Sequence, residues 1–182
     1  MELDLADFQS VRKFAQSVTE RFPHVNILIN NAGILDGNGV LRNTKDHFES
    51  HMQVNYLGHF LLTNLLLDHL KKGAPGARVV CLGSTMHVLA HLDTEDLSLE
   101  RAQSLGFGNF LPYNNSKLAH ILFARELASR LEGTGVHTYS LCPGMIRTEL
   151  FRNEAWYKQT IYSFNLLFAG STISEVRVGI TV

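Results

Sequence analysis

One stretch of the sequence, PYNNSKLAHILFARELASRL, places a tyrosine and a lysine one helical turn apart. Side chains four residues apart share one face of a helix, so Tyr113 and Lys117 can reach the same small ligand. A phenol with an ordinary pKa of about 10 is a weak base at neutral pH. Because a neighbouring ammonium favours the phenolate, we expect Lys117 to lower the pKa of Tyr113 and make it a general acid and base. Such pairs are common on surfaces, so this hypothesis needs support from elsewhere in the chain.

Two further polar residues could join this pair. Ser84 closes the apolar run ARVVCLGS, at the carboxyl end of a predicted strand, where open α/β sheets bind ligands. Its hydroxyl could orient a substrate oxygen toward Tyr113, or it could only satisfy local backbone groups. Asn55 lies within a predicted helix, where a buried amide without hydrogen bonds costs about 1–3 kcal/mol. We therefore expect Asn55 to be hydrogen-bonded and to hold a water that passes protons to Lys117.

Small residues follow two other predicted strands. Asn31, Ala32 and Gly33 come directly after the apolar run VNILIN, and Pro143 and Gly144 end the run VHTYSLCPG. Small residues at strand ends let a ligand approach the backbone closely. Because parallel strands end at the same edge of a sheet, we expect these residues to lie near Ser84.

The elements that must position these residues alternate between short apolar runs and helical patterns. This alternation predicts parallel strands joined by helical crossovers. Asp7 and Thr44 are the expected caps of the first two helices. We expect helices at 8–22, 44–70 and 113–131, and strands at 25–30, 77–84 and 136–144.

Composition narrows the class of protein. The chain has 182 residues, of which 45% are hydrophobic and 18% charged, as in an ordinary globular α/β domain. Sixteen basic residues against 17 acidic ones leave no basic footprint for a nucleic acid, so we expect none as a partner.

The sequence also bears on compartment. Cys81 and Cys142 lie in apolar runs and are expected to be reduced, which fits a reducing compartment. The opening residues MELDLADFQS do not form a signal peptide, and the most apolar stretch, 60–70, is shorter than a membrane-spanning helix requires. The apolar segment 161–170 could contact a bilayer surface, cover an apolar substrate or pack in a core.

Two histidine pairs have the spacing of metal ligands on a helix, His47 with His51 and His87 with His91. Neither pair is accompanied by the carboxylates or thiolates that would complete a site of three or four ligands. We therefore predict no metal site.

Five motifs in order resemble those of the short-chain dehydrogenase/reductase family, and in particular its retinol-dehydrogenase-like branch. They are NNAG (30–33), VNYLGHF (54–60), VVCLGS (79–84), YNNSK (113–117) and CPGMIRTEL (142–150). The resemblance runs from about residue 3 to about residue 168. It implies an α/β fold, a Rossmann-type doubly wound parallel sheet that binds NAD or NADP.

The resemblance also implies roles for individual residues. Tyr113 would be the catalytic acid/base, Lys117 would lower its pKa and bind the nicotinamide ribose, Ser84 would orient the substrate, and Asn55 would hold the relay water. The cofactor-binding residues would be Asp4, Leu5, Asn31, Ala32, Gly33, Tyr113, Lys117, Pro143, Gly144, Ile146 and Thr148.

The sequence departs from the family at both ends. The phosphate-binding TGxxxGIG loop and the strand that selects NAD or NADP do not occur, and GILDGNG at 33–39 does not open a helix after a strand as that loop does. Residues after 168 do not resemble the family's closing elements. We therefore expect residues 1–182 to form a single partial domain with the first two strand–helix units missing, and we leave open which nucleotide it prefers.

The expected function is hydride transfer between a nicotinamide cofactor and an alcohol or carbonyl on a lipophilic substrate such as a retinoid or polyprenol. The resemblance implies a cytoplasmic or endoplasmic-reticulum-like, membrane-associated location. Two alternatives stay open. The chain could be a non-catalytic truncated variant that dimerises with full-length subunits through helices 44–70 and 113–131, or a chain whose exposed sheet edges prevent stable folding.

Overall fold

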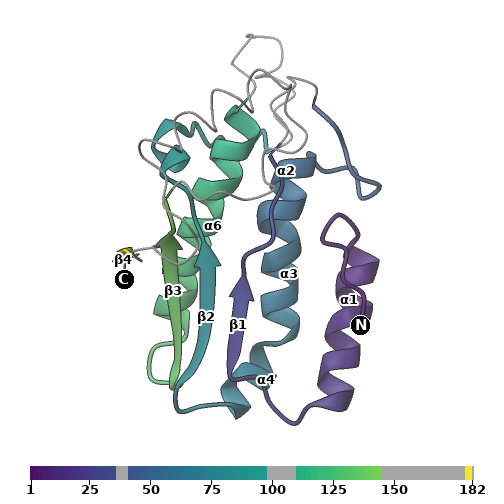
Figure 1. Cartoon of the computed structure of the whole chain (residues 1–182), viewed down its shortest axis with the longest axis vertical. Coiled ribbons are helices and arrows are strands. Elements are labelled where there is room, and N and C mark those ends of the chain that lie inside the picture. The colour runs from purple at the N-terminus through teal and green to yellow at the C-terminus, as the bar shows by residue number, and fades with distance from the viewer. Residues whose placement is uncertain (36–40, 98–109, 145–178, 182) are drawn as a thin grey trace.

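The computed structural model describes residues 1–35, 41–97, 110–144 and 179–181, and in them a sheet with helices packed against it (Figure 1). Three parallel strands, β1 (Ile27–Asn30), β2 (Ala77–Leu82) and β3 (Val136–Cys142), confirm the predicted parallel α/β arrangement. A short strand that the sequence did not predict, β4 (Gly179–Thr181), runs antiparallel to β3. The strand order is β1-β2-β3-β4.

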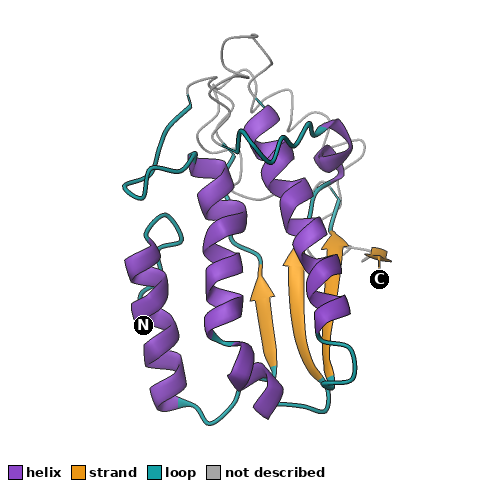
Figure 2. Ribbon diagram, turned by 180° about the vertical axis from the view of Figure 1, so that it is seen from behind, coloured by secondary structure: helices purple, strands orange, loops and turns teal. Residues whose placement is uncertain are grey.

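Helices α3 and α6 lie on one face of the sheet, and α1 stands beside α3, beyond the β1 edge (Figure 2). Helix α1 (Phe8–Arg21) begins as predicted, because the Asp7 side chain accepts a hydrogen bond from the backbone N–H of Gln9. Its buried residues Val11 and Ala15 recur at helical spacing. Helix α6 (Leu111–Arg130) also matches its prediction, beginning two residues earlier, with Pro112 in its first turn.

The second predicted helix differs most from its expected form. Thr44 does not cap it: the Thr44 N–H donates to the Phe48 carbonyl in a turn, and the helix begins at Ser50 with Glu49 as its cap. The helical run then consists of α2 (Ser50–Met52), a π-helical turn η1 (Gln53–Leu57), α3 (Gly58–Leu65) and α4 (Leu67–Lys72). Such π turns insert one extra residue and often lie at functional sites. Here the inserted turn contains Asn55.

The core lies between the sheet and these helices. Val79 and Cys81 on β2 are fully buried and pack against Phe123 and Leu127 on α6. A second cluster joins α1 to α3. The first cluster fixes α6 against the face of the sheet, and the second fixes α1 against α3.

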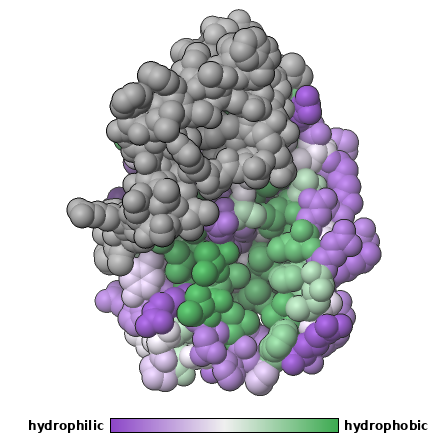
Figure 3. Space-filling model, in the orientation of Figure 1, coloured by the Kyte–Doolittle hydropathy of each residue, from purple (hydrophilic) through white to green (hydrophobic). Residues whose placement is uncertain are grey.

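The opposite face of the sheet is apolar and open over β1. Figure 3 shows the hydrophobic patch above the strands. Its β1 side chains Ile27 and Ile29 are 54% and 59% exposed. Both cysteines are free thiols, Cys81 buried and Cys142 half-buried. Across the described ranges, no helix is both long and apolar enough to cross a membrane.

Candidate active site

The carboxyl ends of β1 and β2 meet the start of α6, and there the structure brings the predicted pair together. Tyr113 and Lys117 are only 5% and 6% exposed. The Lys117 Nζ lies 5.7 Å from the centroid of the Tyr113 ring, within reach of a cation–π contact. The same Nζ donates to the carbonyl of Leu82, at the end of β2, over 3.0 Å. The side chains share one face of α6, as their spacing predicts.

Ser84 is half-buried and begins the 3₁₀ turn η2 (Thr85–Leu89). Its Oγ accepts a hydrogen bond from the Met86 N–H over 3.3 Å. Its side chain also hydrogen-bonds the side chain of Tyr113, which lowers the pKa of the phenol. Ser84 thus satisfies a local backbone group and also faces the tyrosine, while its role in orienting a substrate oxygen stays a prediction.

The protonation of the pair differs from the prediction. Burial raises the pKa of Tyr113 above its ordinary value, and the hydrogen bond from Ser84 offsets this only in part. Lys117 is not among the groups that shift the phenol, so the predicted lowering by Lys117 is wrong for the protein alone. Burial instead lowers the pKa of Lys117 itself, from 10.5 to about 8. A sequence gives spacing but not the depth of burial, which decides both directions.

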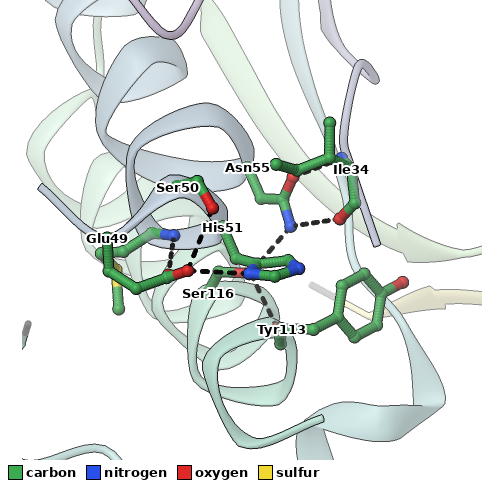
Figure 4. Close-up of polar contacts among 8 residues, drawn as sticks. Ile34, Glu49, Ser50, His51, Asn55, Tyr113 and Ser116 are labelled. Carbon is green, nitrogen blue, oxygen red and sulfur yellow. Dashed lines mark hydrogen bonds and ion pairs between the residues drawn. The ribbon is translucent and has the colours of Figure 1, made fainter. Parts of the chain in front are cut away.

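Asn55 is fully buried in the π turn and hydrogen-bonded, as expected (Figure 4). Its Oδ1 accepts from the Ile34 N–H over 2.7 Å, and its Nδ2 donates to the Ile34 carbonyl and to Ser116 Oγ over 3.1 and 3.0 Å. Ser116 Oγ in turn donates to the Tyr113 carbonyl over 2.7 Å. Asn55 thus braces the chain after β1 against the first turn of α6. The relay water at Asn55 stays a prediction.

The NNAG segment borders the same site. Asn31 and Ala32 are exposed and Gly33 is half-buried. A Cβ on Gly33 would lie 3.0 Å from Asn55 Oδ1 and 3.6 Å from Lys117 Nζ, so the space beside the lysine exists because residue 33 has no side chain. The Gly33 backbone, with Asn55 Oδ1 and Lys117 Nζ beside it, forms an open, polar-lined wall on this side of the site.

The remaining residues predicted to bind the cofactor differ in their exposure and in their place in the structure. Asp4 is exposed, with its carboxylate accepting from the Ala6 N–H over 2.9 Å, whereas the Leu5 side chain is 6% exposed and belongs to the α1–α3 core. Leu5 can therefore meet a ligand through its backbone only. Pro143 and Gly144 follow β3 at the site's edge. Ile146 and Thr148 lie outside the described residues.

Sequence reasoning missed two buried histidine arrangements. The first stacks His59 on His120, with ring centroids 5.3 Å apart, and His59 Nε2 hydrogen-bonds the Ala32 carbonyl over 2.8 Å. Burial lowers the pKa of His59 to about 4 and that of His120 well below its ordinary value. The second joins His51 to Glu49 beside Tyr113. Nothing in the spacing of these residues predicts either contact.

Histidines from both pairs with metal-ligand spacing make other contacts in the structure. His51 contacts Glu49, and His87 Nδ1 lies 2.6 Å from the Ser84 carbonyl. Within the part of the chain that the structure covers, no three His, Cys, Asp or Glu side chains gather as metal ligands would.

Comparison with known proteins agrees with this geometry. The family model described as enoyl-(acyl carrier protein) reductase matches residues 1–165. The chain belongs to the short-chain dehydrogenase/reductase family. It is 47% identical to retinol dehydrogenase 12 of Homo sapiens, covering 85% of this chain and 46% of that protein. It is 45% identical to retinol dehydrogenase 11 of Mus musculus, covering 90% of this chain and 50% of that protein.

A solved structure shares the fold. The Pseudomonas aeruginosa RhlG/NADP active-site complex superimposes with a TM-score of 0.64 at 26% identity, covering 84% of this chain and 55% of that one. The chain therefore spans about half the length of the relatives it matches. The fold is the family's Rossmann-like fold, present in part.

Proposed function

We propose that this chain carries the catalytic half of an NAD(P)-dependent oxidoreductase that interconverts an alcohol and a carbonyl on a lipophilic, retinoid- or polyprenol-like substrate. The observation that supports this most is the convergence of Tyr113, Lys117 and Ser84 beside the open wall at Gly33. The retinol dehydrogenases among its relatives support the substrate class. The NADP complex of RhlG supports a nicotinamide dinucleotide.

The chain's own residues would handle the proton. Because burial raises the pKa of Tyr113, the phenol is protonated at neutral pH and suited to donate to a carbonyl oxygen. Ser84, hydrogen-bonded to Tyr113, would hold that oxygen. Lys117, with a pKa of about 8, is largely an ammonium at neutral pH and would bind ribose hydroxyls. A bound nicotinamide would supply the hydride to the carbonyl carbon. These protonation states favour the reductive direction.

The test removes the phenol hydroxyl alone. In a fusion that places a family phosphate-binding segment before Met1, Tyr113→Phe should reduce NADPH-dependent retinal reduction at least about 100-fold, the range of general acid catalysis, while the nucleotide still binds. Reduction is followed by NADPH absorbance and binding by nucleotide fluorescence. Ser84→Ala is the matched control at the neighbouring hydroxyl and should weaken turnover less. Unchanged turnover in Tyr113→Phe would remove Tyr113 from the mechanism.

A second function, non-catalytic pairing with full-length subunits, is favoured by one feature. Helices α3 and α6 lie side by side (Figure 2), and their outer side chains Phe60 and Leu122 are 41% and 45% exposed. Light scattering of this chain mixed with a full-length family subunit should then detect a mixed dimer that Leu122→Glu abolishes. A folded chain that stays monomeric in the mixture argues against pairing.

A further inference from the structure

A buried acid–imidazole pair lies against Tyr113. Glu49 and His51 are 1% and 3% exposed. Glu49 Oε1 lies 2.8 Å from His51 Nδ1, and Glu49 Oε2 accepts from the Met52 N–H over 2.8 Å (Figure 4). The same carboxylate therefore caps α2 and fixes one nitrogen of the imidazole.

The carboxylate in this pair is ionised at neutral pH. Burial acts to raise the pKa of Glu49, but the hydrogen bond and charge interaction with His51 and the bond from the Met52 N–H outweigh it, so the pKa is lowered. An ionised carboxylate is the stronger hydrogen-bond acceptor. The ring plane of His51 is thus set by a strong bond made inside the protein.

That ring plane meets the tyrosine. The rings of His51 and Tyr113 are perpendicular, at 85°, with centroids 6.4 Å apart, the edge-to-face arrangement that aromatic pairs prefer. Lys117 Nζ lies 5.7 Å from the same Tyr113 ring. The Tyr113 backbone is held separately, because Ser116 Oγ donates to its carbonyl. The Tyr113 ring is therefore contacted from the helical run that Glu49 caps, and its carbonyl is held within α6 by Ser116, whose Oγ accepts from Asn55 on that run.

We propose that Glu49 and His51 form a positioning pair: Glu49 orients the His51 ring, and His51 holds the Tyr113 ring at the angle that directs its hydroxyl to Ser84. This rests on the proposed role of Tyr113 as proton donor. His51 does not exchange a proton with substrate in this account; it acts through the tyrosine.

The experiment reads the Tyr113 hydroxyl directly, without nucleotide or turnover. The 182-residue chain is produced with 3-fluorotyrosine at its 5 tyrosines, and the ¹⁹F resonances are followed against pH. Tyr113→Phe and Tyr56→Phe assign two of them. Tyr56 is the internal control, because burial also raises the pKa of its half-buried phenol, and its ring contacts Phe60 and Phe123.

Two substitutions separate the contact of His51 with Glu49 from its contact with Tyr113. His51→Asn keeps a side-chain N–H for Glu49 but removes the ring that contacts Tyr113. His51→Phe keeps a ring but loses the bond to Glu49. Each should raise the Tyr113 titration midpoint by about 0.5 pH units. The reason is that a weakened edge-to-face contact lets the Tyr113 hydroxyl move out of line with Ser84, and the free energy of such a ring contact corresponds to a shift of this size. In a Ser84→Ala background the same substitutions should have no further effect.

Each outcome decides the proposal. An unmoved Tyr113 midpoint in both variants, or a shift that persists undiminished with Ser84→Ala, overturns it, since the second result would mean that His51 acts by excluding water. If the Tyr56 resonance shows that the His51 variants do not fold, Glu49→Gln, which keeps an acceptor for the helix cap, replaces them. A raised midpoint in Glu49→Gln then supports the pair and an unchanged one overturns it. Failure of NADPH to bind the unsubstituted chain would count against the proposed function alone.

Discussion

Replacing Lys117 with methionine should stabilise the protein at neutral pH while abolishing the nucleotide binding proposed for this site. Lys117 is 6% exposed and carries a charge that its surroundings disfavour. Methionine has a similar length and no charge, so it fills the same volume without desolvating an ammonium. Residues kept for catalysis at a cost in stability are expected to behave in this way.

The magnitude follows from the pKa of Lys117, which burial lowers from 10.5 to about 8. This difference corresponds to about 3 kcal/mol of destabilisation at a pH where Lys117 is charged in both the folded and the unfolded chain. The bond that Lys117 Nζ donates to the Leu82 carbonyl is lost in the variant, which costs about 1–2 kcal/mol. We therefore expect Lys117→Met to raise the free energy of unfolding by about 1–2 kcal/mol at neutral pH.

The sign of the pH dependence is specific. Below pH 8 the lysine is charged in both the folded and the unfolded chain, so the full cost of burying the ammonium destabilises the fold. Between pH 8 and 10.5 the unfolded chain binds one proton more than the folded chain, so the free energy of unfolding rises with pH. Urea denaturation of both proteins at pH values across this window measures the difference. The advantage of Lys117→Met should shrink or reverse as pH rises. An advantage that does not change with pH, or a variant less stable at neutral pH, would show that burial of the Lys117 ammonium does not destabilise the fold.

Two further substitutions test the packing around the site. The unsubstituted protein should lose stability between about pH 7 and about pH 5, because His120 gains a proton there in the unfolded chain but not in the fold, where it is buried and stacked on His59. His120→Leu should reduce this loss by about 1–2 kcal/mol, as measured by urea denaturation at both pH values. An equal loss of stability in both proteins would contradict this. Gly58→Ala should cost about 1–3 kcal/mol, since its Cβ would lie 2.8 Å from the Leu5 carbonyl oxygen. Thermal unfolding measures that loss, and an unchanged melting temperature would show that the contact between Leu5 and α3 can relax.

The sequence was sufficient for the elements with local signals. Asp7 capped α1 as its side-chain chemistry predicts, and the apolar runs gave all three parallel strands within about two residues. The prediction that Thr44 caps the second helix was wrong because tertiary contacts decide where that helix begins. Glu49 is its cap and is buried against His51, a contact that no local sequence pattern reveals.

The candidate site was predictable in its members but not in its electrostatics. Helical spacing placed Tyr113 and Lys117 together, and strand ends placed Ser84 near them. The directions of the pKa shifts of Tyr113 and Lys117 depend on burial among residues distant in sequence. The stacking of His59 on His120 likewise joins two helices that are far apart in the sequence. Both the burial and the stacking arise only when the core has folded, so the sequence alone does not predict them.

Titration of the folded 182-residue chain with NADPH, read by nucleotide fluorescence, measures directly whether the Tyr113–Lys117 site binds a nicotinamide cofactor. We expect saturable binding that Lys117→Met abolishes and Tyr113→Phe largely keeps, because Lys117 Nζ lies beside Gly33 and is the proposed donor to the ribose hydroxyls. A folded chain that leaves NADPH fluorescence unchanged, or binding unaffected by Lys117→Met, would contradict the claim that this edge of the sheet holds a nicotinamide cofactor.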